Sequence, residues 1–203
     1  MLTKIFVEGI ADHKFISDFI SYHFNVVLDK NDIIISNGWT NIYSDGEGEL
    51  FINEMNKNSS IDGRNIMIFD ADSDYNNRLT EINQWRINNQ LEFEIFLFPN
   101  NSGPGDLETV LENIINKKNA AIFDCWDKYE TCLSKIQIEG RVKPLTIPAK
   151  KTKIYGYLET LALTYNDKVL AKEEKRDYKN SKNWNLDSEY LLALKDFLSP
   201  YFS

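Results

Sequence analysis

The chain has 203 residues, of which 42% are hydrophobic and 13% aromatic, and its formal net charge is −8 at pH 7. A chain of this length and apolar content can bury an ordinary core, and we expect an α/β core with an appendage. The negative charge excludes a protein coated in basic surface, so any nucleic-acid partner has to be met by a local basic patch.

The amino terminus opens directly into Lys4-Ile5-Phe6-Val7-Glu8. It has no basic start, long apolar stretch or cleavage site, which are the marks of a secretory signal. No segment of the chain is apolar enough to span a bilayer. We therefore expect a cytoplasmic protein with no membrane partner.

Apolar runs and helix-like patterns alternate through the first half of the chain. Four short apolar runs are typical of buried strands, at 4–7, 33–35, 66–69 and 93–98. The segments between them favour helices, at 13–24, 49–57 and 75–89. Strands that are apolar throughout need cover on both faces. The predicted fold class is therefore α/β, with a doubly wound, mainly parallel four-stranded sheet and helices on both faces.

Beyond Pro99 the pattern changes to helices. The candidate helical segments are 106–116, 118–135, 154–165 and 187–198. The segments 139–153 and 168–183 are interpreted as loops, the second because it is charged and has little apolar content. We expect an α/β core over residues 1–115 and a C-terminal helical extension over 116–203, packed on the core as a second unit or continuous with it.

Two cysteines, Cys125 and Cys132, lie seven residues apart in the expected helix 118–135. No third or fourth ligand accompanies them, so they do not resemble a zinc framework. Buried thiols in a reducing compartment are favoured over a disulfide.

Three alternating aspartates, Asp70, Asp72 and Asp74, follow the third predicted strand. In an extended segment their carboxylates lie side by side, and their like charges repel unless a cation sits between them. A divalent metal is the leading explanation. Asp74 has a structural alternative, because an aspartate there can cap the helix that follows.

Other carboxylates follow the remaining strand ends. Glu8 closes the first strand, Asp12 comes one helical turn later, and Glu108 follows the fourth strand. Ligands of open α/β sheets gather at the carboxyl ends of the strands, and a cluster of hard oxygen donors suits Mg²⁺, Mn²⁺ or Ca²⁺. Asp12 has a helix-capping alternative, and Glu108 can instead complement a helix dipole.

The ordered motifs resemble a known superfamily. Glu8-Gly9 after the first strand and Asp70-Ala71-Asp72 after the third are similar to the Toprim domain of topoisomerases, primases and the overcoming-lysogenization-defect nucleases. The longer signature, which adds Asp12, Asp74 and Gly105-Asp106-Leu107-Glu108, resembles the small standalone Toprim-like proteins classed as DUF3226. The likeness covers residues 4 to about 112 and extends more loosely into the tail.

The resemblance implies a Mg²⁺- or Mn²⁺-dependent nuclease or related phosphotransfer enzyme, in antiphage defence or nucleic-acid maintenance. Glu8 would be metal ligand or general base, and Asp70 and Asp72 would hold the metal. Asp12 and Glu108 match positions that serve a second ion in nuclease members, so one or two ions are expected. Lys153 would contact the transition state, because the family uses a basic residue in its tail.

Basic residues bear on the nucleic-acid substrate. Five of them fall within thirteen residues that contain no Asp or Glu: Arg141, Lys143, Lys150, Lys151 and Lys153. If the extension folds over the strand ends, they could neutralise DNA or RNA phosphates beside the metal. The alternative is an ordinary solvated surface. A homodimer or a partner protein is also compatible with the sequence.

Two other functions stay open. One is a non-catalytic Toprim-like module that holds a metal or nucleotide and serves a partner protein. The other is a calcium-binding regulatory protein, because Asp70, Asp72, Asp74 and Glu81 occupy positions 1, 3, 5 and 12 of an EF-hand loop. Against it, position 6 is Tyr75, where the loop requires glycine.

Overall fold

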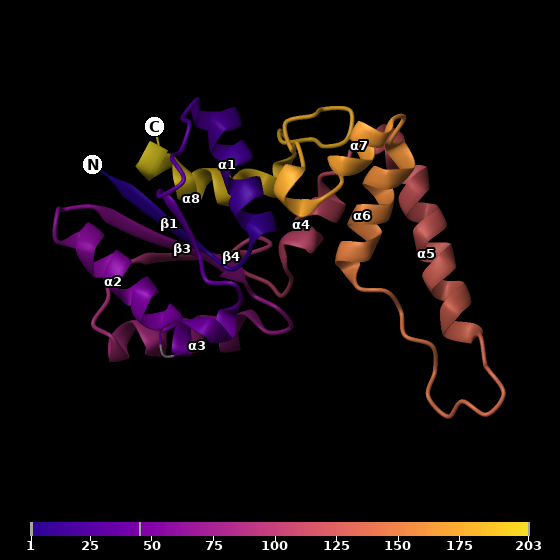
Figure 1. The fold of residues 1–203 in the computed structure, drawn as a ribbon, viewed down its shortest axis with the longest axis horizontal. Helices are drawn as coiled ribbons and strands as arrows, with labels where there is room; N and C mark the ends of the chain where they lie inside the picture. Colours follow the sequence, from indigo (N-terminus) through magenta and orange to yellow (C-terminus); the bar gives the residue numbers. More distant parts are fainter. Residues whose placement is uncertain (1, 45, 203) are drawn as a thin grey trace.

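Four parallel strands form a single sheet in the order β2-β1-β3-β4. The structure, a computed structural model, describes residues 2–44 and 46–202. The strands are β1 (Thr3–Val7), β2 (Ile33–Ile35), β3 (Arg64–Asp70) and β4 (Glu94–Phe98). Helices cover both faces of the sheet (Figure 1). The predicted α/β fold class is confirmed.

The helices of the first half are α1 (Ile10–Phe24), α2 (Glu47–Ser59) and α3 (Tyr75–Asn88), with a 3₁₀ turn, η1 (Trp39–Tyr43), before α2. Those of the second half are α4 (Leu107–Asn113), α5 (Ala120–Lys135), α6 (Lys150–Leu161), α7 (Tyr165–Val169) and α8 (Leu192–Phe202). None of the helices within residues 2–44 and 46–202 is both long and apolar enough to cross a membrane.

Several predicted boundaries were wrong. Helix α1 begins three residues earlier than predicted, because the Asp12 carboxylate and the Gly9 backbone cap it. Helix α6 begins at Lys150 and ends at Leu161, so the predicted helix 154–165 was placed four residues too late. Helix α7 and the turn η1 were not predicted. Short 3₁₀ and single-turn helices carry too few apolar positions to show a period.

Side chains of each strand alternate between two buried layers. In β1, Ile5 and Val7 pack with α1, α4 and α8, whereas Phe6 packs with α2 and α3 on the opposite face. In β3, Ile66 and Ile68 share the first of these faces. Burial of one such aliphatic or aromatic side chain contributes about 1.5–3 kcal/mol. The continuous apolar runs 5–7, 33–35, 66–69 and 95–98 therefore follow from cover on both faces.

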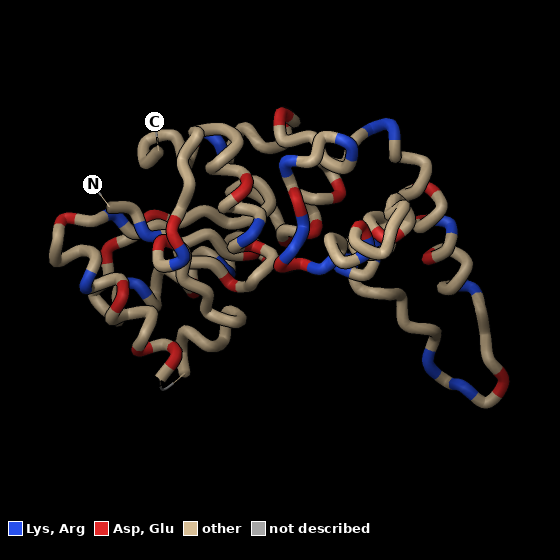
Figure 2. The backbone as a smooth tube through the Cα atoms, turned by 45° about the horizontal axis from the view of Figure 1, so that its top comes forward, with Lys and Arg blue, Asp and Glu red and all other residues tan. Residues whose placement is uncertain are grey.

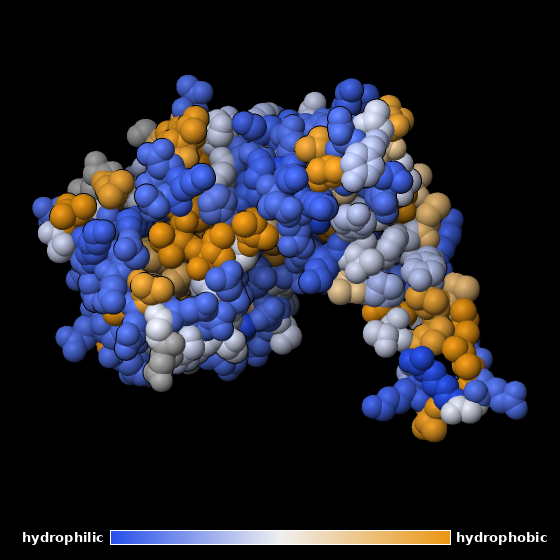
Figure 3. Space-filling model, in the orientation of Figure 1, coloured by the Kyte–Doolittle hydropathy of each residue, from blue (hydrophilic) through white to orange (hydrophobic). Residues whose placement is uncertain are grey.

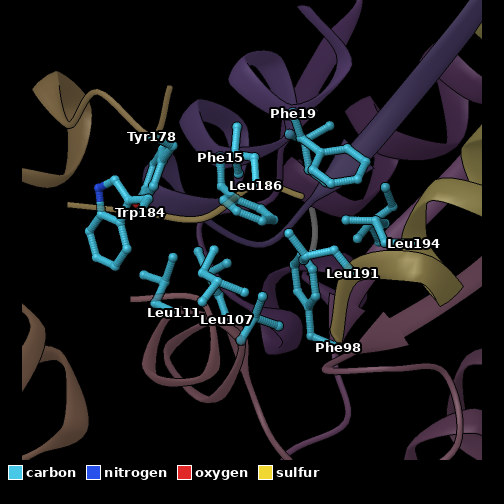
Figure 4. Packing of buried hydrophobic residues seen from close by; sticks show 14 of the residues in the cluster. Phe15, Phe19, Phe98, Leu107, Leu111, Tyr178, Trp184, Leu186, Leu191 and Leu194 are labelled. Carbon is cyan, nitrogen blue, oxygen red and sulfur yellow. The ribbon is translucent and has the colours of Figure 1, made fainter. Parts of the chain in front are cut away.

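The C-terminal tail completes the core on the α1 face. Figure 4 shows Tyr178 and Trp184 of the tail beside Phe15 of α1 and Leu111 of α4. The rings of Phe15 and Tyr178 meet edge to face with centroids 5.2 Å apart. One continuous cluster thus joins the first strand to the last helix. The predicted boundary at residue 115 stays a prediction.

Helices α5 and α6, with the irregular connection 136–149 between them, form an arm that stands away from the sheet (Figure 1). Apolar side chains lie at the surface of this arm (Figure 3). Helix α6 covers one side of α5, and Phe123 is the buried residue of α5. Cys125 and Cys132 are free and exposed, so the prediction of buried thiols was wrong.

Candidate functional site

The parallel register brings the carboxyl ends of β1 and β3 together. Val7 pairs with Ile68, so Glu8 and Asp70 follow on neighbouring strands at the same edge of the sheet. The backbone N–H of Asp70 donates to Oε1 of Glu8 across 2.9 Å. Asp70 continues the alternation of Ile66 and Ile68 toward the α1 face. Two of the predicted site residues are therefore in direct contact.

Asp12 reaches the same edge from the first turn of α1. The Gly9 N–H donates to Oδ2 of Asp12 across 2.9 Å, and the Asp12 side chain thereby caps the helix. A side chain on Gly9 would place a Cβ 3.2 Å from that oxygen, so glycine leaves room for the close turn. Asp12 is only 7% exposed. Asp12 therefore caps α1 and also lies with Glu8 and Asp70 at this edge of the sheet.

Helix α4 adds Glu108 to this edge. Its first residue, Leu107, donates its N–H to Oδ1 of Asp70 across 3.0 Å, which sets Glu108 beside the strand ends. Asp106, the N-cap of α4, accepts from the Thr109 N–H across 2.8 Å. The anchor between α4 and β3 therefore brings a fourth predicted residue to the site.

We call Glu8, Asp12, Asp70 and Glu108 the acidic cluster. Burial is the largest cause that raises the pKa of each of these carboxyls. Repulsion from Glu8 and Glu108 raises the pKa of Asp12 further, to about 7. Repulsion from Asp12, Glu8 and Glu108 also holds the pKa of Asp70 well above its ordinary value. The cluster therefore carries an electrostatic cost that a bound cation would offset.

Asp72 lies at the margin of the acidic cluster. Its carboxylate pairs with Arg78 of α3, and its side chain is 57% exposed. The backbone at Asp72 is left-handed (φ 53°), and its carbonyl accepts from the Gly105 N–H across 2.7 Å. Repulsion from Asp72 contributes to raising the pKa of Glu8, so the two carboxyls are electrostatic neighbours.

Asp74 caps helix α3, which is the structural role that the sequence left open for it. Its side chain accepts from the Asn77 N–H across 3.0 Å and caps α3. Helix α3 starts at Tyr75, so Glu81 lies within a helix and pairs with Arg78 at 3.6 Å. The open twelve-residue loop that the calcium hypothesis requires is not formed over residues 70–81.

The predicted basic residues divide into two groups. Lys150 Nζ lies 3.1 Å from Oδ1 of Asp106 and 2.8 Å from Oγ1 of Thr109, beside the start of α4. Lys151 is exposed next to it. Lys153 instead lies between the helices of the arm and α4, 2.7 Å from Asp127. The structure brings Lys150 toward the acidic cluster and holds Lys153 away from it.

Arg141 and Lys143 lie at the tip of the arm, where Figure 2 shows basic residues at the far end of the tube. The Arg141 side chain donates to the carbonyls of Lys143 and Pro144, and so fixes the local turn. The arm therefore carries exposed positive charge away from the sheet.

The burial of Arg176 and Tyr178 was not predicted, because the segment 168–183 was interpreted as a loop. Arg176 is 1% exposed, its Nε donates to the Ala171 carbonyl across 3.1 Å, and its charge lowers the pKa of Glu108. The Tyr178 N–H donates to Asp18 of α1 across 2.9 Å. An aromatic residue inside the charged run 168–183 was the available signal that part of this segment is buried.

The donor chemistry of the acidic cluster fits a hard divalent cation. One oxygen each of Glu8, Asp12 and Asp70 accepts a backbone N–H, and a backbone hydrogen bond from Trp39 also lowers the pKa of Glu8. Within the described ranges, no group of three or more His, Cys, Asp or Glu side chains is arranged so that it could hold a metal ion as it stands.

The chain was compared with known proteins. A family model described as "Protein of unknown function (DUF3226)" matches residues 3–203, which is nearly the whole chain. No curated protein and no solved structure matches the chain. The match agrees with the predicted resemblance to this family.

Proposed function

The chain belongs to the DUF3226 family, and from that premise we propose that it is a Toprim-like nuclease, or a related phosphodiester-cleaving enzyme, that uses Mg²⁺ or Mn²⁺. The supporting observation is the acidic cluster, in which one buried carboxyl, that of Asp12, and three partly buried carboxyls meet at the carboxyl edge of a parallel sheet. Clustered acids of this kind are common at catalytic sites.

The side chains of the cluster would have distinct roles. Glu8 accepts the Asp70 N–H at Oε1, and its carboxylate would serve as an ion ligand or as acceptor of a proton from an attacking water. Asp70 would bind the ion through Oδ2, because Oδ1 accepts from Leu107. Asp12 and Glu108 would hold a second ion. A bound divalent ion lowers the pKa of water and stabilises charge on the leaving oxygen.

Basic residues around the cluster would bind the phosphodiester backbone. Lys150 is the closest of the predicted set, because it contacts the N-cap of α4. Lys151 at the start of α6, and Arg141 and Lys143 at the arm tip, would extend the contact along DNA or RNA. Lys153 is held by Asp127, so the proposal assigns the phosphate contact to Lys150. A cytoplasmic location and a role in antiphage defence or nucleic-acid maintenance belong to the same proposal.

The test is cleavage of plasmid DNA and of RNA by purified protein with Mn²⁺. Glu8→Gln and Asp70→Asn should each abolish cleavage. The matched control is Glu94→Gln, which alters an exposed glutamate at the amino end of β4 and should leave cleavage unchanged. Cleavage that persists in both cluster variants would identify a contaminating nuclease.

A non-catalytic metal- or nucleotide-binding module is the second candidate. It is favoured by the ion pair between Asp72 and Arg78, which engages one of the expected ligands. This alternative predicts thermal stabilisation by Mn²⁺ with no turnover on any nucleic acid. Turnover that depends on Glu8 would reject it.

A further inference from the structure

Arg78 is held at the edge of the acidic cluster by three contacts. Its guanidinium pairs with Asp72, lies 3.6 Å from Oε2 of Glu81, and stacks over the Trp39 ring with its carbon 4.5 Å from the centroid. The side chain is 11% exposed. Arg78 is therefore a mostly buried cation with a fixed position.

The Trp39 ring on which Arg78 stacks packs against the core. Trp39 meets the Phe69 ring edge to face at 5.9 Å, and Phe69 comes directly before Asp70 in β3. Nε and Nη1 of Arg78 are buried and make no hydrogen bond within the part of the chain that the structure describes. Nη2 donates to Oδ2 of Asp72, so this charged hydrogen bond, the pairing with Glu81 and the stacking on Trp39 together hold the side chain.

Arg78 also acts on Glu8. The pKa of Glu8 is lowered by the charge of Arg78 and raised by the charge of Asp72. The guanidinium is thus electrostatically coupled to two carboxylates that are expected to bind a divalent ion. Arg78 is therefore a positive group beside carboxylates that an ion would use.

We propose that Arg78 is the built-in counter-cation of this site, and that a divalent ion must displace it from Asp72 in order to bind. The idea rests on the proposed metal site. The supporting observation is the ion pair itself, in which Arg78 engages one of the carboxylates expected to bind the ion. Arg78 then sets the metal affinity, because the energy of its pairing with Asp72 opposes binding.

The direction in which Mn²⁺ affinity changes when Arg78 is removed separates competition with the ion from a purely structural role. If Arg78 competes with the ion, its removal should tighten Mn²⁺ binding. If Arg78 only braces α3 against Trp39, its removal should loosen the site and weaken Mn²⁺ binding. Competition between charges also predicts that the difference becomes smaller as ionic strength rises.

The experiment is calorimetric titration of the full chain with MnCl₂ at low ionic strength. Arg78→Met should lower the Kd for Mn²⁺ about tenfold, because one unit of opposing charge is removed next to the ligands. Arg78→Gln should show the same direction, because glutamine keeps an N–H donor for Asp72 but carries no charge. Arg78→Lys keeps the charge and should stay near the unmodified Kd.

A matched control is Arg86→Met on the same helix. Arg86 also lies over an aromatic ring, with its guanidinium carbon 5.7 Å from the Phe93 centroid. Phe93, however, directly precedes β4 and so lies at the amino ends of the strands, whereas the acidic cluster lies at their carboxyl ends. The Kd for Mn²⁺ should not change in this variant. Circular dichroism of each variant establishes that the fold is retained.

The outcomes are distinguishable. Absence of Mn²⁺ binding by the unmodified chain would overturn the proposed metal-dependent function and this inference with it. Mn²⁺ binding that is unchanged or weaker in both folded variants, Arg78→Met and Arg78→Gln, would overturn the counter-cation role alone. Tighter binding in either folded variant, with Arg86→Met unchanged, supports it.

Discussion

Glu8 accepts the backbone N–H of Asp70 through Oε1 at 2.9 Å, and this hydrogen bond ties the end of β1 to the end of β3. The bond needs an acceptor at Oε1 but no negative charge. Burial raises the pKa of Glu8, so the charge itself is unfavourable in the ion-free protein. A substitution at Glu8 can therefore remove the negative charge while keeping the hydrogen bond to Asp70.

The first prediction concerns Glu8→Gln. Glutamine keeps an oxygen acceptor for Asp70 and removes one charge from the acidic cluster. We expect the ion-free variant to melt at the same temperature as the unmodified protein or a few degrees above it. Stabilisation by Mn²⁺ should be lost. Thermal unfolding with and without MnCl₂ measures both, and a variant that is strongly destabilised without metal would contradict this account of the bond.

The second prediction is a pH dependence that arises from Asp12. The pKa of Asp12 is about 7 in the folded protein, against an ordinary value of 3.8. Between these values the folded chain binds more protons than the unfolded chain, so the contribution of Asp12 to stability falls as pH rises. Below the lower value this contribution is fully present.

Urea unfolding of the ion-free protein from about pH 4 to about pH 8 tests this sign. Asp12→Asn should flatten the decline, because asparagine does not titrate. Mn²⁺ should stabilise the unmodified protein more at the upper end of the range, because metal binding competes with protons for carboxylates. A decline of equal slope in Asp12→Asn would assign the effect to other groups.

Sequence was sufficient for the sheet because each strand contains a continuous apolar run, as required for strands covered on both faces. Asp70 and Glu8 were predictable as neighbours because they follow adjacent parallel strands. The partners of Asp72 were not predictable, because nothing in the spacing shows that Arg78 turns back toward the strand end. Arg176 was missed for a related reason, since long-range packing against α1 buries a segment whose composition is polar.

The exposure of Cys125 could not be read from the sequence either. Burial of both thiols was predicted because free cysteine is usually a buried side chain. In the structure α6 covers one side of α5, and both cysteines are exposed. An amphipathic pattern shows which side is covered but not how much of the helix is covered.

The third prediction tests the arm tip. Replacing Arg141 and Lys143 together with glutamine should weaken nucleic-acid binding and reduce the slope of log K against log salt by about one to two. Both residues are exposed, so the melting temperature should not change. Fluorescence anisotropy with a labelled oligonucleotide at several salt concentrations measures the slope. Lys57→Gln on α2, whose side chain is 75% exposed, is the control.

The fourth prediction concerns the packing of α5 on α6. A Cβ at Gly156 would lie 2.7 Å from the Trp126 ring, so Gly156→Ala should force the two helices apart. Overpacking of this kind costs about 1–3 kcal/mol. Hydrogen exchange should rise in the arm, whereas the Kd for Mn²⁺ should stay constant because no residue of the acidic cluster belongs to the arm. A change in Mn²⁺ affinity would show that the arm and the cluster are coupled.

The fifth prediction concerns Gly105, which links Asp72 to the start of α4. Its φ is 142°, and an added Cβ would lie 2.9 Å from Pro99 and 3.0 Å from Thr109, so Gly105→Ala is strained and crowded. We expect a loss of stability of about 1–3 kcal/mol. The Gly105 N–H also bonds the Asp72 carbonyl, so displacement of this turn should move α4 and weaken Mn²⁺ binding.

The control for this prediction is Gly103→Ala, where the nearest atom of another residue is 3.7 Å from the added Cβ. If Gly105→Ala and Gly103→Ala bind Mn²⁺ with the same Kd, the Gly105 turn does not position the acidic cluster.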